Sequence, residues 1–422
     1  MIAKETFRTL IKEGQEEIGD IQLFDRMVDI EPNGRYVFVG IRQAGKSYLL
    51  FQQAQKKLKE GHDLTEIVYI NFDDERLIGM TADDFDSILQ VYGSLYDCKP
   101  ILFFDEIQNV DGWEHFARRL ANQKYSIYIT GSNARMLSHD ILTIMGGRYL
   151  DKWIWPYSFG EYVKSRGVAL EKEWQYGKKR QTVQQLMAEY FLWGGFPELQ
   201  LYRNKRSWLN GLYEKILLGD VAHRNGIRNE LALRLTMKRI AENVNQPVSY
   251  NRIANLVKSS GVSTSAASIM QYVGYAKDAC ILFSIENYNA KFVEKETVKK
   301  HYFADNGLLS IFLTSGDASL LENLCAIHLY QKYAKDVYFY NQNIEVDFFV
   351  PDARLAVQAC YYLHGDSEKE ATFEREVSAL VKLNERFPCK RNLIVTYDEE
   401  VQVERDGVTI EVLPVWKWLL TE

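Results

Sequence analysis

The stretch Gly40-Ile41-Arg42-Gln43-Ala44-Gly45-Lys46-Ser47 fits the pattern GxxxxGK[ST] at every fixed position. It follows a short apolar run, Tyr36 to Val39, and leads into a run that permits a helix. Glycines let such a loop turn its N–H groups toward phosphates, and the start of a helix adds partial positive charge there. We therefore predict that this loop binds a nucleoside triphosphate.

The type of each residue in the loop suggests a role. Lys46 would place a full charge on the β- and γ-phosphates, and the hydroxyl of Ser47 would bind Mg²⁺. The alternative is a glycine-rich turn without a ligand, which the agreement of strand, loop and helix disfavours. The predicted ATP contacts are Gly40, Ile41, Arg42, Gln43, Ala44, Gly45, Lys46, Ser47 and Tyr48.

Four more short apolar runs recur along the first 155 residues, separated by stretches that permit helices. Such alternation predicts an α/β fold with a doubly wound parallel sheet covered on both faces. The runs are Ile67 to Ile70, Ile101 to Phe104, Ile127 to Ile129 and, more weakly, Tyr149 to Ile154. Residues before about Glu31 read as a helix that leads into this domain.

Polar residues follow two of these runs. Asp105 and Glu106 follow the run Ile101 to Phe104. Asp105 would hold Mg²⁺, and Glu106 would act as general base on the attacking water. Ser132 and Asn133 follow the run Ile127 to Ile129, at the sheet edge where ligands of doubly wound folds bind. Asn133 is the predicted sensor of the γ-phosphate, and Ser132 is nearly as good. The alternatives are a strand that ends in solvated acids and, for Asn133, a simple helix cap.

These motifs, in this order, resemble the AAA+ ATPases. The resemblance implies an arginine that acts on a neighbouring subunit, placed before the fifth strand. Arg148 falls there, and Arg135 is a weaker candidate. A surface ion pair is the alternative for Arg148. A homo-oligomer is thereby left open.

Downstream motifs look like those of a prokaryotic group of uncharacterised AAA+ ATPases with a C-terminal domain of unknown function. They are residues 155–162, 193–197, 302–308 and 345–348. The expected domains are an ATPase core at 1–155, a helical lid at 156–240, a winged-helix-like unit at 241–310 and a restriction-endonuclease-like α/β domain at 311–422.

The last two domains are expected to meet DNA or a protein partner. The second helix of the winged-helix-like unit, near Thr264 to Gly274, lacks arginine and lysine, so the phosphate contacts would come from nearby basic residues. These are Lys258, Lys291, Lys295, Lys299, Lys300 and His301. In the C-terminal domain Glu322 and Asp347 fit a nuclease centre, but Gln358 and Cys360 stand where an acid and a lysine are needed, so nuclease activity is disfavoured.

Bulk properties set the remaining limits. The 422 residues include 51 basic and 57 acidic side chains, a net charge of −6, which argues against attraction of the whole chain to nucleic acid. Five scattered cysteines suggest neither a disulfide framework nor a zinc site, and no apolar run is long enough for a membrane span. A cytoplasmic ATPase that uses ATP and Mg²⁺ to drive its C-terminal domains is the expectation. The alternatives are a nucleotide-gated binding module with little turnover and, less favoured, an ATP-regulated nuclease.

Overall fold

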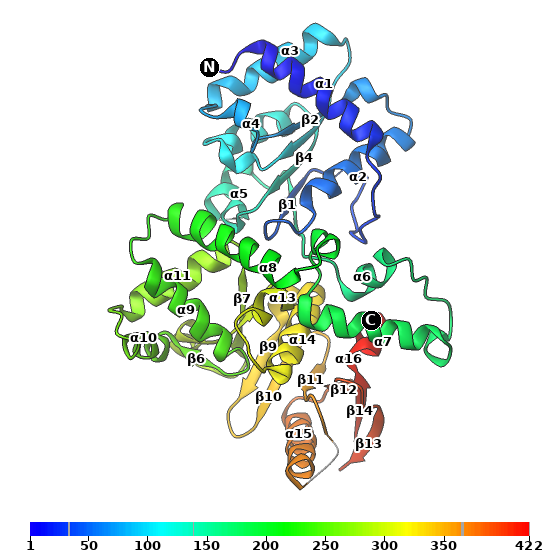
Figure 1. Ribbon diagram of the computed structural model, residues 1–422, viewed down its shortest axis with the longest axis vertical. Coiled ribbons are helices and arrows are strands. Elements are labelled where there is room, and N and C mark those ends of the chain that lie inside the picture. Colours follow the sequence, from blue (N-terminus) through cyan, green and yellow to red (C-terminus); the bar gives the residue numbers. More distant parts are fainter. Residues whose placement is uncertain (33, 138, 364–366, 422) are drawn as a thin grey trace. The chain divides into compact units, whose positions relative to one another are not determined.

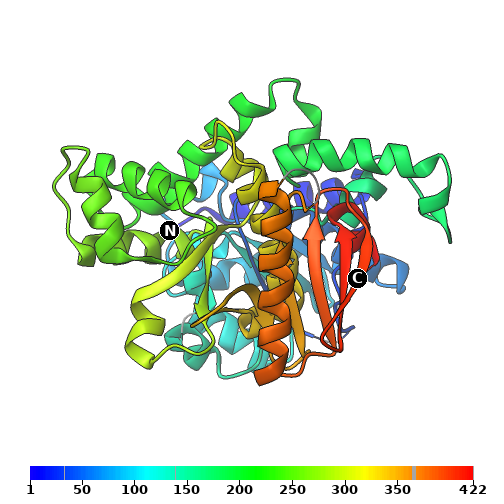
Figure 2. The ribbon, with the colours of Figure 1, turned by 90° about the horizontal axis from the view of Figure 1, so that it is seen from below.

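The computed structural model describes residues 1–32, 34–137, 139–363 and 367–421. The chain forms two compact units (Figures 1 and 2). Unit 1 comprises Met1–Trp155 with Asp278–Cys280, and unit 2 comprises Pro156–Lys277 with Ile281–Glu422. No helix in the described part of the chain is both long and apolar enough to cross a membrane.

Unit 1 contains a five-stranded sheet in which every pairing is parallel, in the order β2-β3-β4-β1-β5. All five predicted strands are present, and the α/β class is confirmed. β1 to β4 are almost fully buried, as expected of a sheet covered on both faces, whereas β5 is an exposed edge. The strands are β1 Tyr36–Val39, β2 Ile67–Asn71, β3 Ile101–Asp105, β4 Ser126–Gly131 and β5 Leu150–Trp153.

This strand order positions the site. β4 lies between β1 and β3, so the phosphate loop after β1 and the acidic pair after β3 flank the end of β4. All three segments leave the sheet at its carboxyl edge because the strands are parallel. The registers agree, since Val39 pairs with Gly131 and Phe104 with Ile129.

The helices of unit 1 alternate with its strands, and α1, α2 and α4 pack directly on the sheet. They are α1 Lys4–Asp20, α2 Lys46–Lys59, α3 Phe85–Leu95, α4 Trp113–Asn122 and α5 His139–Met145. The first helix ends earlier than predicted, because Ile21 is already extended. The segment that follows carries the buried Arg26, whose guanidinium donates to the carbonyls of Ala44 and Trp155, each at 2.8 Å.

Unit 2 contains a nine-stranded mixed sheet in the order β13-β14-β12-β11-β10-β9-β7-β8-β6. Apolar runs in the sequence at 281–285, 302–304, 337–340, 345–350, 355–359 and 391–396 predict β7 to β12 approximately, whereas β6, β13 and β14 are not predicted. The strands are β6 Val248–Ser249, β7 Leu282–Asn287, β8 Val298–Phe303, β9 Tyr338–Asn341, β10 Glu345–Val350, β11 Leu355–Ala359, β12 Arg391–Thr396, β13 Val401–Arg405 and β14 Val408–Pro414.

Helices make up the first part of unit 2, as predicted for residues 156–240. These are α6 Phe159–Ser165, α7 Lys179–Trp193, α8 Lys205–Glu214, the π-helix Lys215–His223 and α9 Glu230–Glu242. The later helices are α10 Tyr250–Lys258, α11 Ala266–Asp278, α12 Phe292–Thr297, α13 Asn306–Ser310, α14 Asp317–Tyr333, α15 Ser367–Arg386 and α16 Val415–Thr421.

The elements expected of a winged helix are present as a helix pair, α10 and α11, and an antiparallel hairpin, β7 and β8. However, β7 also pairs in parallel with β9, through Glu286 and Tyr338. The strands expected in two domains, 241–310 and 311–422, therefore belong to one sheet. The four-domain division itself stays a prediction.

Two motifs that are distant in sequence meet inside unit 2. Asp305 accepts hydrogen bonds from the backbone nitrogens of Gly195 and Gly307, each at 2.7 Å. A Cβ on Gly194 would lie 1.9 Å from an oxygen of Asp305, and the φ of Gly194 is +74°. Gly194 is thus required by close packing against this buried aspartate, whereas a Cβ on Gly195 would lie 2.2 Å from the carbonyl oxygen of Tyr157.

Candidate functional site

The phosphate loop of unit 1 is held in shape by two glycines with different tasks. Gly45 has a φ of +92°, a left-handed conformation that glycine adopts without strain, and it caps the start of α2. At Gly40 a Cβ would lie 1.9 Å from the carbonyl oxygen of Ile154, just after β5. The backbone of Ile154 also donates to Val39 at 2.7 Å. The start of the loop therefore needs a residue without a side chain.

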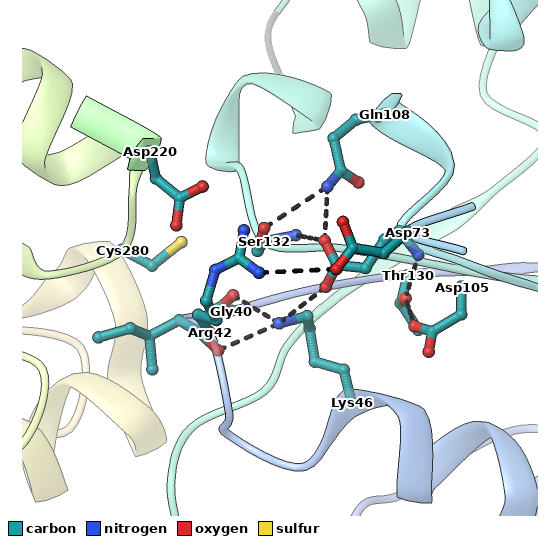
Figure 3. Close-up of polar contacts among 12 residues, drawn as sticks. Gly40, Arg42, Lys46, Asp73, Asp105, Gln108, Thr130, Ser132, Asp220 and Cys280 are labelled. Carbon is teal, nitrogen blue, oxygen red and sulfur yellow. Dashed lines mark hydrogen bonds and ion pairs between the residues drawn. The ribbon is translucent and has the colours of Figure 1, made fainter. Parts of the chain in front are cut away.

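Lys46 is buried at the first turn of α2, and its ammonium turns back over the loop. Its Nζ donates to the carbonyls of Gly40 and Ile41, both at 3.1 Å, and lies 3.5 Å from Oε1 of Glu106 (Figure 3). A full positive charge is thus fixed between the phosphate loop and the end of β3. Such a charge is the feature that a bound polyphosphate requires.

Asp105 lies fully inside the sheet edge and is surrounded by hydroxyl donors. Tyr69 donates to its Oδ2 at 2.9 Å, the hydroxyl of Thr130 donates to its Oδ1, and Ser47 is a further hydrogen-bond partner. Burial, followed by the neighbouring Glu106, raises the pKa of Asp105 above its ordinary value. The hydroxyl of Ser47 beside the carboxylate of Asp105 is a set of hard oxygen donors, which fits Mg²⁺.

Glu106 has a φ of +51° directly after β3 and is clamped on both carboxylate oxygens. Oε1 faces Lys46, and Oε2 accepts from Nε2 of Gln108 at 2.5 Å and from the backbone nitrogen of Ser132 at 3.2 Å (Figure 3). Burial alone would raise the pKa of Glu106, but Lys46 and these donors outweigh it and hold the pKa below its ordinary value. The carboxylate is therefore ionised and oriented.

Gln108 is the contact that sequence reasoning missed. It lies in the 3₁₀ turn Ile107–Asn109 and reaches both Glu106 and, at 3.5 Å, the hydroxyl of Ser132. Its Oε1 is buried without a hydrogen-bond partner among the described atoms. The only available signal was its position two residues after the acidic pair.

Ser132, and not Asn133, enters the network around Glu106. The side-chain oxygen of Asn133 accepts from the backbone nitrogen of Arg135 at 2.9 Å, so it caps the next turn, which is the alternative weighed above. Asn133 is nevertheless buried beside the edge where β4 ends. Its role as a γ-phosphate sensor stays a prediction.

The remaining predicted residues lie at the rim. Arg148 is exposed between α5 and β5 and donates to the carbonyls of Met145 and Gly146, at 3.3 and 3.0 Å. Arg135 instead pairs with Asp278 at 2.7 Å. Tyr48 is half exposed on α2, and Arg42 lies 4.0 Å from Asp73 (Figure 3).

The acidic residues predicted in the C-terminal region also come together, within unit 2. Glu322 on α14 and Asp347 on β10 both bind Lys300 of β8, each at 3.0 Å. Lys300 and His301 are fully buried, so the expectation that they contact phosphates at the surface is wrong. Lys299 pairs with Glu286 at 2.7 Å. Burial raises the pKa of Cys360 to about 12, so its thiol is neutral and cannot replace the cation of a lysine.

Comparison with known proteins gives two family matches along the chain. An AAA domain matches residues 33–163, and a domain of unknown function, DUF8612, matches residues 184–319. An uncharacterized protein of Methanocaldococcus jannaschii is 32% identical over 98% of this chain and 95% of its own length. An uncharacterized protein of Haemophilus influenzae is 30% identical over 91% of this chain and 94% of its own length.

Solved structures give more distant likenesses. Cdc6p from Pyrobaculum aerophilum is 13% identical with a TM-score of 0.26, covering 69% of this chain and 88% of that one. AMPPCP-bound DnaA from Aquifex aeolicus is 16% identical with a TM-score of 0.26, covering 66% and 89%. The AAA domain match and the relatives that span nearly the whole chain carry the assignment: the chain belongs to the P-loop AAA+ superfamily, in one family with these uncharacterized archaeal and bacterial proteins.

Proposed function

We propose that unit 1 binds ATP with Mg²⁺ and hydrolyses it. The observation that carries the proposal is the clamp on Glu106: an ionised carboxylate held between a buried lysine and two hydrogen-bond donors, beside the phosphate loop. A strand end that served only folding would gain little from burying three charged groups here, because each must be compensated by partners.

The groups of the chain would act in a definite order. Lys46 leaves its present partners for the β- and γ-phosphates, since a phosphate carries more charge than the carbonyls of Gly40 and Ile41. Glu106 then loses one counter-ion, and its freed oxygen orients and accepts a proton from the attacking water. Gln108 and Ser132 keep the other oxygen in place. Ser47 and Asp105 would hold Mg²⁺, which would supply charge neutralisation at the phosphates.

The proposal also includes a DNA or protein partner, which unit 2 would bind. ATP turnover would change the conformation of this unit and of the DNA or protein bound to it. Arg148 would complete the site of a neighbouring copy, which its exposed place between α5 and β5 allows. A second candidate function is a nucleotide-gated module with little turnover, favoured by the same clamp because Oε1 of Glu106 is paired with Lys46 until that lysine moves.

An ATPase assay on the purified chain, with and without DNA, tests the proposal. Lys46→Ala should abolish ATP binding. Glu106→Gln should retain binding and lower turnover by about 100-fold or more, the usual scale for a general base. Unchanged turnover in both variants would sink the assignment. Retained ATP binding with negligible turnover in the unmodified chain would favour the gated module.

A mixing experiment addresses Arg148. Arg148→Ala and Glu106→Gln proteins are each expected to be inactive, and mixed assemblies should recover activity, because one interface then combines an intact Glu106 with an intact Arg148. Mixtures that never exceed the separate proteins would remove the case for action on a neighbouring copy.

A further inference from the structure

Unit 2 contains a cavity of about 930 Å³ whose floor is acidic and whose mouth is basic. The floor includes Glu322, Glu345, Asp347 and Glu376, from α14, β10 and α15. Arg252, Arg375 and Lys382 line the same cavity and are exposed. The volume is in the range of cavities that hold a ligand of several hundred daltons.

Three of these acids contact Lys300, a fully buried residue of β8. Its Nζ lies 3.0 Å from Glu322, 3.0 Å from Asp347 and 3.4 Å from Glu345. Two of the three N–H donors of this ammonium are used by hydrogen bonds to Glu322 and Asp347, and Glu345 lies within ion-pair distance. Burial opposes the charged form, but the three acids outweigh it and raise the pKa of Lys300 above its ordinary value.

The carboxylates are themselves fixed in this arrangement. Oδ2 of Asp347 accepts from the backbone nitrogen of Ala359 at 3.1 Å, and Tyr302 donates to Glu322 at 2.7 Å. Gln358 spans β10 by accepting from the nitrogen of Asp347 at 2.7 Å and donating to the carbonyl of Glu345 at 3.0 Å. Gln358, which stands where a nuclease would have an acid, is thus used to hydrogen-bond the backbone of Glu345 and Asp347. These residues therefore do not fit a nuclease metal centre.

The charges of the cavity balance only when Lys300 is counted with the basic mouth. Four acids face three exposed cations, and the buried ammonium cancels the difference. Of those exposed cations Arg375 is already paired with Glu376, at 2.6 Å. Arg252 and Lys382 form no ion pair with any side chain that the structure describes. Arg252 and Lys382 are therefore the two cations of the described lining that an anion can reach without breaking an ion pair, and Lys300 reduces the charge of the three acids around it from −3 to −2.

We propose that this cavity binds the phosphodiester backbone of a single-stranded nucleic acid without a divalent cation, with the ammonium of Lys300 in the place between the acids that such a cation would need. Tyr361 lines the cavity next to the half-exposed Tyr362, their ring centroids 4.6 Å apart. Aromatic rings beside basic side chains are the combination that single strands use, through base stacking and phosphate contacts.

The test measures binding of fluorescein-labelled oligo-dT and oligo-rU by anisotropy. It uses the full chain carrying Lys46→Ala, without nucleotide, so that its outcome does not depend on ATP binding. At least one oligonucleotide should bind equally well in EDTA and in millimolar Mg²⁺, and the preferred arm identifies DNA or RNA. Arg252→Glu with Lys382→Glu should weaken binding at least about 10-fold and flatten its salt dependence, because two phosphate contacts are lost. Lys335→Glu, outside the lining, is the matched control.

A second variant probes the floor itself. Lys300→Met should weaken oligonucleotide binding and create Mn²⁺ binding detectable by electron paramagnetic resonance, because three carboxylates are left uncompensated. If Lys300→Met does not fold, the charge-reversal pair still decides the matter, since both of its sites are exposed. Absence of binding by either oligonucleotide, full binding by the charge-reversed pair, or a requirement for Mg²⁺ would each overturn the proposal.

Discussion

Each unit has a buried lysine close to acidic residues, Lys46 in unit 1 and Lys300 in unit 2, and we expect the first to exchange its partners and the second to keep them. Lys46 donates to two neutral carbonyls and faces one carboxylate at 3.5 Å, so a phosphate can replace its partners at little cost. Lys300 is surrounded by three carboxylates and is completely buried. A buried ammonium that three carboxylates surround cannot be released without leaving several charges unpaired. We therefore expect the type of partner to distinguish a lysine that a ligand can recruit from one that is fixed in the fold.

The largest expected effect follows from removing the fixed lysine. Lys300→Met should lower the unfolding free energy of unit 2 by about 3–5 kcal/mol, the usual cost of breaking a buried pair on one side. Hydrogen exchange read on β8 and α14 measures this unit separately. Glu345→Gln is the control, because this half-exposed acid at 3.4 Å should contribute less than about 1 kcal/mol. Equal, small losses in both variants would show that the two lysines do not differ in kind.

The next effect concerns the exchangeable lysine. ATP at about 100 times its dissociation constant should stabilise unit 1 by about 2.7 kcal/mol, from mass action alone. Hydrogen exchange of α2 and β3 reports the gain. Lys46→Met should remove it, whereas Lys59→Met, on the same helix, should keep it. Persistence of the gain in Lys46→Met would mean that phosphates do not recruit this lysine.

The smallest expected effect is a pH dependence of the stability of unit 2, caused by the buried His301. Burial lowers the pKa of His301 to about 3, so between pH 6.5 and 3 the unfolded chain binds a proton that the folded unit does not. Stability should therefore fall as the pH falls, by about 2 kcal/mol at pH 5 relative to pH 7. His301→Asn should flatten this slope in urea unfolding, and the same change at exposed His115 should not. If the unfolding free energy depends on pH equally in both variants, a group other than His301 must cause that dependence.

The sequence predicted the parallel sheet and the phosphate loop because both depend on local pattern. Short buried strands ending in Gly40 or Asp105 are recognisable without knowing their neighbours. Gln108 and Lys300 could not be found this way. Lys300 lies in the basic run Lys299-Lys300-His301, which reads as a solvated surface. Its burial depends on acids of α14 and β10, which only the folded sheet brings near.

The division of unit 2 was harder for a related reason. The pairing of β7 with β9 joins segments some fifty residues apart, and no local period announces such a pairing. β13 and β14 were missed because their exposed faces carry charged residues that dilute the apolar pattern. Chemistry encoded by a short motif was thus predictable, whereas chemistry assembled across the sheet was not.

Arg26 holds the carbonyls of Ala44 and Trp155 in the same guanidinium, each at 2.8 Å. Ala44 is inside the phosphate loop, and Trp155 is the last residue of unit 1 before the chain continues into unit 2. Any displacement of the loop must therefore either carry Trp155 with it or break a buried, charge-assisted hydrogen bond. The guanidinium therefore ties the phosphate loop to the last residue of unit 1, so that the conformation of the loop and the position of the Trp155 carbonyl depend on each other.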